Sequence, residues 1–338
     1  MSGAPPELLL RVNGRQAAWI GDFYQDTSRD IALHHDPYRR ANTSVSLIVR
    51  RGDDLLLHLL VDCGLGALNS LLDYQYQAGV NRIDALCLTH PHFDHIAGLD
   101  WLAHACRRSD VPEQPKPLPL YCSQPCYEEA IGRRFTWLKD LYVHRPLQSG
   151  QALRIEGREG VVLSLTPLSV WHGPTAPGAM IYSIDWDNGR QRRRIVLAWD
   201  LLRLADGVDD APLHDADVLM IDSTSWHPQT AKDDATSAKN HNTWHGSIEE
   251  WLTLLPVWRP KRTYWIHYSG FSDSSPHETC PQPEWAAIKG VLTEEEFRLH
   301  TRHEAERLSM DIRVARHGLR IPADDPWPGE DLGLRAQD

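Results

Sequence analysis

The chain has 338 residues, of which 41% are hydrophobic, so it is long enough to bury a core and to form one large domain. Its formal net charge of −11 excludes a broadly basic surface of the kind that holds long nucleic acid by its phosphates. The apolar segments are too short to cross a bilayer, and residues 1–10 show neither a basic leader nor a cleavage site. We therefore expect no membrane partner.

The cysteines indicate a reducing compartment. The chain contains 6 of them, and Cys87 lies within an apolar segment that reads as a core strand. Reduced thiols in a cytoplasmic protein fit this pattern better than a disulfide scaffold. Cys122 and Cys126 have the spacing of a structural zinc pair, but no second pair follows at a finger-like distance.

The first half of the chain alternates apolar strands with helical segments. A hairpin is predicted where the polar residues 51–54 separate two apolar stretches. The expected elements, in chain order, are strands 46–49 and 55–62, helix 67–78, strand 85–88, helix 96–107, a strand around Leu120 and a helix 127–135. Residues 108–119, rich in proline and charge, are expected to form a surface loop.

The second half begins as sheet. Strands are predicted at 161–170, 179–186, 194–199 and 218–221, with Asn188-Gly189 as a hairpin turn. A polar segment, 225–242, is expected to be an exposed loop that covers a site. A helix at 248–255 is expected to end at Pro256, and strand 263–266 follows.

No internal repeat and no linker divides the chain, so a single domain spanning 1–338 is the simplest organisation. Its core is expected at about 42–300. The proline-containing tail, 321–338, is expected to be extended and loosely packed.

The strongest chemical signal is the run His90-Pro91-His92-Phe93-Asp94-His95, which directly follows the strand at 85–88. Neutral imidazole suits zinc and its neighbours, and a loop that leaves a strand can turn alternate side chains toward one point. A single structural histidine does not explain four polar groups crowded into six positions. The run therefore predicts a metal site.

Together with the following Ile96-Ala97-Gly98-Leu99, this run resembles the signature of the metallo-β-lactamase superfamily. The resemblance extends from about residue 42 to 270, because further family elements occur in the expected order at strand ends: Asp62, His172-Gly173, Asp200 and His267. It implies an α/β fold, the αββα sandwich, in which two mixed β-sheets are flanked by helices and the metals lie at one edge.

The resemblance also implies two divalent metal ions, with zinc first and manganese or iron as alternatives. One ion is expected on His90, His92 and His172, the second on Asp94, His95 and His267, and Asp200 is expected to bridge them. Asp62 would brace the metal loop, residues 90–95, without binding an ion. Two ions roughly 3.5 to 4 Å apart would acidify a shared water into a nucleophilic hydroxide.

Within the superfamily, His172-Gly173, residues 42–46 and a histidine before a helix, His245, resemble the phosphodiesterase branch. That branch includes the tRNA 3′-end endonuclease, a cyclic ribose phosphodiesterase and cyclic-nucleotide phosphodiesterases. In it a histidine at the position of His245, oriented by a carboxylate matched here by Asp222, acts on the leaving group. His227 and His241 on the polar loop compete for this role.

Two features depart from that branch. The glycine-rich turn usual near its N-terminus is missing, and the interval between His172 and Asp200 leaves little room for an arm that grips tRNA. A small phosphodiester therefore fits better than tRNA. Several tryptophans lie near these positions, which fits packing better than stacking on a base: Trp171, Trp199, Trp226 and Trp244.

The expected function is that of a dinuclear metal-dependent hydrolase, in which metal-bound hydroxide attacks a small cyclic or linear nucleotide-like phosphodiester. Asp94, Asp222 and His245 are its expected catalytic residues. A carbonyl-ester hydrolase, such as a thioesterase or lactonase, is the alternative on the same metals, and it would make Asp222 and His245 dispensable. A metal-stabilised binding scaffold without turnover is the alternative of another class. The partner is expected to be a small molecule, and open sheet edges invite a homodimer.

Overall fold

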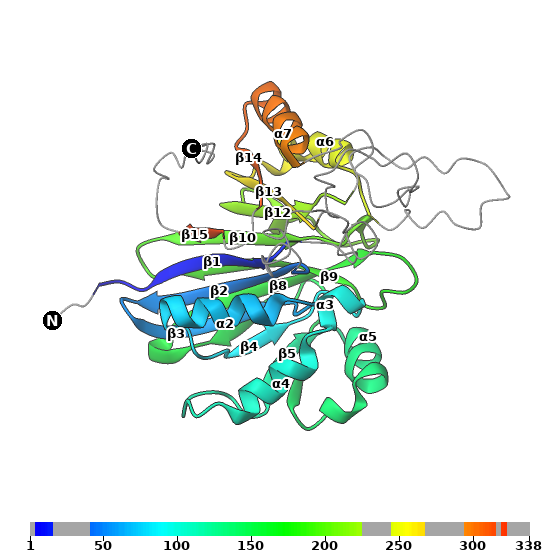
Figure 1. Ribbon diagram of the computed structural model, residues 1–338. Coiled ribbons are helices and arrows are strands. Elements are labelled where there is room, and N and C mark those ends of the chain that lie inside the picture. The colour runs from blue at the N-terminus through cyan, green and yellow to red at the C-terminus, as the bar shows by residue number, and fades with distance from the viewer. Residues whose placement is uncertain (1–3, 16–40, 225–244, 268–293, 316–318, 323–338) are drawn as a thin grey trace, which may run out of the picture.

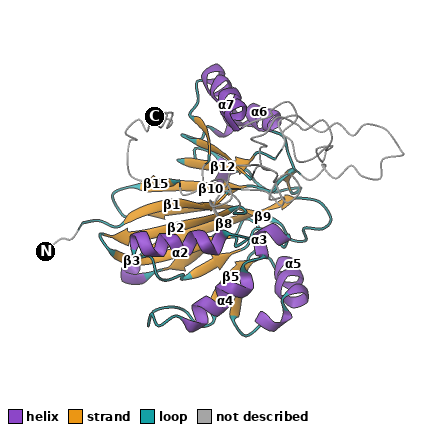
Figure 2. Cartoon of the chain, viewed as in Figure 1, coloured by secondary structure: helices purple, strands orange, loops and turns teal. Residues whose placement is uncertain are grey.

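The computed structural model describes residues 4–15, 41–224, 245–267, 294–315 and 319–322. Two β-sheets lie face to face, and helices cover their outer faces (Figures 1 and 2). A cluster of buried apolar side chains from both sheets, including Leu47, Leu59, Leu163 and Leu197, fills the space between them. The expected αββα sandwich is confirmed.

The first sheet is mixed. Its strands, in spatial order, are β15 (Arg320–Pro322), β1 (Glu7–Gly14), β2 (Ser44–Arg51), β3 (Asp54–Val61), β4 (Ala85–Cys87), β5 (Leu118–Cys122) and β6 (Tyr142–Pro146). The pairs from β15 to β3 are antiparallel, and those from β3 to β6 are parallel.

The second sheet is mixed as well. Its strands, in spatial order, are β11 (Arg203–Leu204), β8 (Val162–Trp171), β9 (Met180–Asp187), β10 (Arg192–Ala198), β12 (Val218–Asp222), β13 (Thr263–Ile266) and β14 (Ile312–Val314), with β7 (Leu153–Glu156) beside β8. Strands β8, β9 and β10 pair antiparallel, whereas β10, β12, β13 and β14 pair parallel.

Helices pack against both outer faces. The first sheet carries α2 (Ala67–Ala78), α3 (Phe93–Ile96), α4 (Leu99–Arg108), α5 (Gln124–Tyr127), the π-helix η1 (Glu128–Arg134) and the 3-10 turn η2 (Thr136–Leu138). The second carries α6 (Ile248–Trp258) and α7 (Glu294–Leu308). Two further 3-10 turns are η3 (Arg158–Gly160) and η4 (Ala211–Leu213).

Three predicted helices differ from the observed ones. The one expected at 127–135 begins at Gln124 as α5 and continues as the π-helix η1. The helix expected at 96–107 begins only at Leu99, as α4, and the short α3 precedes it; between them Gly98 lies so close to Cys63 that a Cβ would be 2.7 Å from Sγ. The helix expected to end at Pro256 continues to Trp258, because Leu255 and Trp258 are buried and Arg259 N–H closes the last turn on the Leu255 carbonyl at 2.8 Å.

The expected core limits of 42–300 are too narrow. Strand β1 pairs with β2 and places Leu8, Leu10 and Val12 in the core, and Ile321 on β15 is 1% exposed rather than loosely packed. The rest of the tail, 323–338, lies outside the described residues. So does the polar segment predicted to form a loop at 225–242, which contains His227 and His241.

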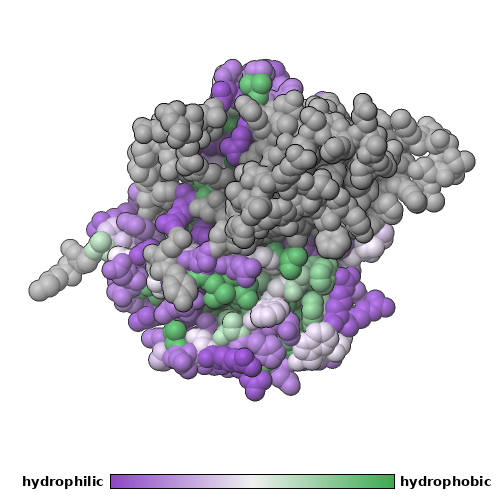
Figure 3. Space-filling model, in the orientation of Figure 1, coloured by the Kyte–Doolittle hydropathy of each residue, from purple (hydrophilic) through white to green (hydrophobic). Residues whose placement is uncertain are grey.

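Hydrophilic side chains cover much of the described surface on the face viewed in Figure 3, with smaller apolar patches among them. Among the described residues, no helix has the length and apolar character needed to span a bilayer.

Candidate metal centre

The candidate site residues follow strand ends. Strands β3 and β4 of one sheet and β8, β10, β12 and β13 of the other end at the same edge of the sandwich, and each delivers a polar side chain there: Asp62, His90, His172, Asp200, Asp222 and His267. Because parallel strands present their carboxyl ends at one edge, residues distant in sequence meet here.

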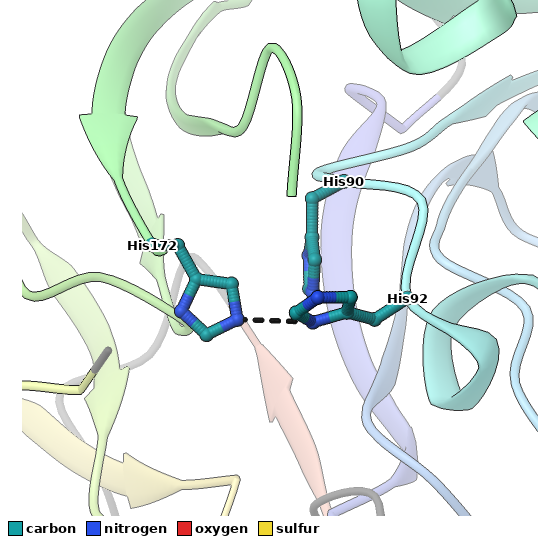
Figure 4. Close-up of side chains that lie close together, drawn as sticks. All are labelled: His90, His92 and His172. Carbon is teal, nitrogen blue, oxygen red and sulfur yellow. Dashed lines mark hydrogen bonds between the residues drawn. The ribbon is translucent and has the colours of Figure 1, made fainter. Parts of the chain in front are cut away.

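The first group consists of His90, His92 and His172, whose imidazoles converge (Figure 4). The Nδ1 of His92 lies 3.2 Å from the Nε2 of His172. Outside this contact, Thr175 Oγ1 lies 2.9 Å from His92 Nε2, and Thr89 Oγ1 lies 3.0 Å from His90 Nδ1. The two hydroxyls therefore fix which nitrogen of each ring faces the centre.

The second group consists of Asp94, His95 and His267. The Oδ2 of Asp94 lies 3.1 Å from His95 Nε2 and 3.5 Å from His267 Nε2. Both predicted ligand triplets are thus brought together as the resemblance implied.

Asp200 lies between the two groups and presents one oxygen to each. Its Oδ1 is 3.2 Å from His172 Nε2 and 3.8 Å from His90 Nε2. Its Oδ2 is 3.1 Å from the Nε2 atoms of both His95 and His267. This is the placement expected of a carboxylate that bridges two cations.

Three buried atoms at this point make no well-aligned hydrogen bond within the described part of the chain, although His95 Nε2 and Asp200 Oδ2 lie 3.1 Å apart: His90 Nε2, His95 Nε2 and Asp200 Oδ2. Burying unpaired polar atoms is costly, so their convergence on one place requires another compensating group. Imidazole and carboxylate donors suit zinc, manganese or iron. The residues therefore fit the pair of divalent ions that the fold implies.

Asp62 braces the centre from behind. Its Oδ1 accepts the backbone N–H of Thr89 at 2.8 Å. Its Oδ2 accepts from Thr89 Oγ1 at 2.7 Å, His95 Nδ1 at 2.7 Å and Trp199 Nε1 at 2.8 Å. The ring of His95 is thereby held with Nε2 toward the centre.

The turn after Asp62 also holds the metal loop. Cys63 N–H donates to the His95 carbonyl at 2.8 Å, and Gly98 N–H donates to the Cys63 carbonyl at 2.7 Å. Gly64 touches the same loop so closely that a Cβ would be 1.6 Å from the Asp94 carbonyl oxygen. Backbone contacts alone therefore fix this loop against the turn.

Three site residues have left-handed backbones, with φ of 57° at Asp62, 56° at Asp200 and 62° at His267. This conformation is uncommon for residues other than glycine, and it persists only where the surroundings enforce it. Here it turns the chain sharply at each strand end.

Burial and neighbouring charge set opposite protonation tendencies in the cluster. Burial lowers the pKa of His90 well below its usual range and that of His92 to about 4, which favours neutral, ligand-competent imidazoles. Burial opposes charge on His267 too, but Asp200, Asp222 and Asp94 raise its pKa to about 10. Despite burial, neighbouring histidines lower the pKa of Asp200 to about 2, so this carboxylate is ionised.

Next to these groups lies the predicted pair of His245 and Asp222. His245 Nδ1 donates to Asp222 Oδ2 at 2.6 Å, and the imidazole ring lies 4.6 Å from that of His172. Asp222 Oδ2 also accepts the Asp200 N–H at 3.0 Å, and Oδ1 accepts the Thr224 N–H at 2.8 Å. Burial lowers the pKa of His245, but the contact with Asp222 raises it above its usual range.

Sequence reasoning missed three supporting residues. Thr175 and Thr224 contact the outer nitrogens of His92 and His267, and Trp199 donates to Asp62. Their signal in the sequence was proximity alone, since Thr175 lies three residues after His172, Thr224 two after Asp222 and Trp199 immediately before Asp200.

The fold and this cluster agree with the sequence family. Residues 58–268, more than half of the chain, match the family described as the beta-lactamase superfamily domain. The chain belongs to the metallo-β-lactamase superfamily, as its histidine-rich run predicted.

Two curated relatives match part of the chain. Ribonuclease Z of Mycolicibacterium gilvum (strain PYR-GCK) is 31% identical over 173 residues, which cover 48% of this chain and 56% of that protein. A protein named octanoyltransferase, from Porphyromonas gingivalis (strain ATCC BAA-308 / W83), is 29% identical over 144 residues, which cover 41% of this chain and 25% of that protein. The chain therefore spans about half the length of the ribonuclease Z relative and a quarter of the length of the octanoyltransferase.

Solved structures share the fold over nearly the whole chain. A diphosphatase from the PhnP family superposes with a TM-score of 0.59 at 18% identity, covering 93% of this chain and 97% of that one. Human tRNase Z, short form, gives 0.55 at 17% identity and covers 94% and 100%. These two structures show the shared fold, and the ribonuclease Z relative adds the expected resemblance in sequence to the phosphodiesterase branch.

Proposed function

We propose that this protein is a dinuclear metal-dependent phosphodiesterase that hydrolyses a small cyclic or linear nucleotide-like phosphodiester. The observation that carries the proposal is the 2.6 Å hydrogen bond between His245 and Asp222, with His245 Nδ1 4.0 Å from the carboxylate of Asp200. Zinc is the first choice of metal, and the proposed ligands are His90, His92, Asp94, His95, His172, Asp200 and His267.

When bound, a pair of divalent ions lowers the pKa of a water molecule and neutralises charge on a phosphoryl group. The protein's contribution is to hold that chemistry in place. Asp200 presents one oxygen to each ligand group, and Asp62 keeps the His95 ring oriented toward it. The burial of Asp94 and Asp200 excludes bulk water from their side of the site.

His245 supplies the proton that a departing alcohol needs. Because Nδ1 is bound to Asp222, Nε2 is the ring nitrogen that remains for the substrate. As the phosphorus–oxygen bond breaks, the leaving oxygen takes the Nε2 proton, and Asp222 stabilises the imidazolium before transfer. The side chain of His245 is 16% exposed while that of Asp222 is 0% exposed, so the proton donor is the accessible member of the pair.

This pair supports phosphodiester hydrolysis over the carbonyl-ester alternative, in which Asp222 and His245 would be dispensable. Asp222 is fully buried, and its Oδ2 accepts hydrogen bonds from His245 Nδ1 and Asp200 N–H. Its Oδ1 accepts the Thr224 N–H and lies 3.8 Å from His267 Nδ1, so the shorter of its two imidazole contacts is the one with His245. The ribonuclease Z relative supports phosphodiester chemistry. The net charge of −11 favours a small substrate over a long polyanion.

The test compares two phosphodiesters with the zinc-reconstituted full chain. The first, bis(4-nitrophenyl) phosphate, has an activated aryl leaving group. The second, an unmodified dinucleotide, has a ribose hydroxyl as a poor leaving group. We expect hydrolysis of both, loss of both in Asp94→Ala, and in His245→Gln a rate on the dinucleotide that falls by about 10²- to 10⁴-fold. The rate on the aryl ester should fall much less.

Zinc binding without phosphodiester turnover contradicts the proposal. If thioesters or lactones are then hydrolysed, and His245→Gln leaves that rate unchanged, the carbonyl-ester alternative is correct. If a protein with two bound metals hydrolyses neither class, the binding scaffold is the better description.

A further inference from the structure

His245 is held close to the start of a well-capped helix. Ser247 is the N-cap of α6, and its Oγ accepts the Glu250 N–H at 3.2 Å while Glu250 Oε2 accepts the Ser247 N–H at 2.7 Å. This capping box fixes the first turn of α6. Only Gly246 separates His245 from the cap.

Gly246 is enclosed on two sides. Its N–H donates to the carbonyl of Leu201 at 2.8 Å, and Leu201 directly follows Asp200. The indole ring of Trp251, one turn into α6, lies against Gly246 so closely that a Cβ there would be 2.0 Å from Cζ2 and 2.5 Å from Cη2.

Trp251 acts here through its shape. It is 3% exposed and packs in the cluster that joins α6 to the second sheet, and its indole N–H has no hydrogen-bond partner among the described residues. The ring atoms that face Gly246 are carbons, so the contact between the two residues is one of shape. The ring thus lies against the residue next to His245.

We infer that Gly246 and Trp251 are positioning residues that hold His245 in register with Asp222. The Leu201 carbonyl and the Trp251 ring restrain the Gly246 peptide, and this restraint keeps His245 Nδ1 at 2.6 Å from Asp222. The inference rests on the proposed role of His245 as proton donor. It adds that the position of the His245 imidazole is set by α6 as well as by Asp222.

A larger side chain at Gly246 and a smaller one at Trp251 should both displace His245 from Asp222. In Gly246→Ala the added methyl group must displace either the Trp251 ring or the peptide that carries His245. In Trp251→Leu the peptide loses the surface that restrains it. The double variant Gly246→Ala/Trp251→Leu removes the ring atoms that collide with the methyl group, so it should recover part of the register.

The first readout does not depend on catalysis. In the zinc-reconstituted full chain, proton NMR follows the hydrogen-bonded Nδ1–H of His245, assigned by its loss in His245→Gln. The Nδ1–H of His95, which lies 2.7 Å from Asp62, serves as an internal reference. We expect Gly246→Ala and Trp251→Leu to shift or broaden the His245 signal and leave the His95 signal in place.

The second readout is the rate ratio between the dinucleotide and the aryl ester. We expect this ratio to fall about 10- to 100-fold in each single variant, as for a misplaced proton donor, and to rise again in the double variant. Trp186→Leu is the matched control, because Trp186 is 1% exposed on β9 and packs in the cluster between the two sheets rather than against α6. It should lower stability without changing the ratio or the His245 signal.

An unchanged His245 signal in both single variants overturns the inference, as does an equal disturbance in Trp186→Leu. If Gly246→Ala does not fold, Trp251→Leu alone decides by the same signal. If the His245 signal responds as expected but the wild-type protein hydrolyses no phosphodiester, the positioning role stands and the proposed function fails.

Discussion

The indole N–H of Trp199 donates a hydrogen bond to the carboxylate of Asp62 across the sandwich, with Nε1 2.8 Å from Oδ2. Trp199 follows β10 of the second sheet, and Asp62 follows β3 of the first. The same oxygen accepts His95 Nδ1, and Trp199 immediately precedes Asp200. One hydrogen bond thus joins the metal loop to the carboxylate that lies between the two ligand groups.

Removing this donor should weaken metal binding. Trp199→Phe retains most of the buried volume but leaves Asp62 Oδ2 with one partner fewer, so His95 and Asp200 are less firmly aligned. We expect the zinc affinity to fall about 10- to 100-fold, as is typical when a group that orients a ligand is lost. Competition with a chromogenic chelator measures this.

Trp186→Phe is the matched control, because Trp186 is 1% exposed in the same core and lies on β9, away from Asp62. It should be destabilised to a similar degree but bind zinc as the wild type does. Equal affinities for Trp199→Phe and Trp186→Phe would show that the hydrogen bond to Asp62 has no part in metal binding.

Thr224 should be needed for the orientation of His267. Its hydroxyl lies 3.1 Å from His267 Nδ1 and donates to the His267 carbonyl at 2.9 Å, which leaves Nε2 facing Asp94 and Asp200. We expect Thr224→Val to lower zinc affinity about tenfold or more. Thr224→Ser, which retains the hydroxyl, should bind zinc nearly as the wild type does; a loss of similar size in both variants would point to packing by the methyl group instead.

The ligands could be predicted from the sequence because the signal for them is local. Four of the seven occupy one run of six residues, and the other three each follow an apolar strand, so their order along the chain was sufficient. Supporting residues such as Trp199 and Trp251 act through contacts between segments that are distant in sequence or separated by a helical turn. Spacing does not encode those contacts.

Strand β1 was missed for a different physical reason. Its positions 11 and 13 are polar but buried, at 5% and 0% exposure, because Arg11 donates to Asn13 Oδ1 and to Ser70 Oγ at 3.0 Å. A buried polar network of this kind interrupts the apolar pattern by which a core strand is recognised. Pairing with β2, which lies about thirty residues away, cannot be read from either segment alone.

Close contact at Gly64 should make it essential to the metal loop. A methyl group at 64 would lie 1.6 Å from the Asp94 carbonyl oxygen and 2.6 Å from Asn42 Cβ, so the backbone of the loop would have to move. We expect Gly64→Ala to lose most of its zinc, measured as metal per protein after gel filtration, and to unfold at a lower temperature.

Gly52→Ala is the control, because there the added methyl group meets no neighbouring atom. Gly52 has a φ of 57°, and nothing lies within 4 Å of an added Cβ, so alanine there costs only the strain of a left-handed backbone, about 1 to 2 kcal/mol. It should retain its zinc. Full zinc content in Gly64→Ala would mean that the turn and the loop adjust without disturbing the ligands.

His58, remote from the metal centre, should make the stability of the fold pH-dependent. It is 2% exposed between the carbonyl of Arg82, 2.8 Å from Nδ1, and the hydroxyl of Ser46, 2.8 Å from Nε2. Ser46 Oγ already accepts from Asn13 Nδ2 at 2.9 Å and donates its own proton to Nε2. Burial lowers the pKa of His58 to about 4, because a second ring proton would be buried against this hydroxyl.

In the unfolded chain the pKa of His58 returns to about 6.5, so between about pH 6.5 and 4 the unfolded state binds more protons than the folded one. The stability that the neutral ring contributes is therefore complete above pH 6.5 and is lost as the pH falls to about 4. The loss attributable to this group is about 3 kcal/mol, at about 1.4 kcal/mol for each pKa unit. Urea unfolding from pH 7.5 to 4 measures it, with chelator present to remove metal binding.

His58→Gln provides the comparison, since carboxylates elsewhere also titrate in this range. The variant should be less stable at pH 7.5, because glutamine does not reproduce both ring contacts, but its free energy of unfolding should decline less steeply as the pH falls. The difference between the two curves isolates His58. Parallel curves across the whole range would mean that the pKa of His58 is the same in the folded and the unfolded chain. The buried contacts would then not disfavour the charged ring.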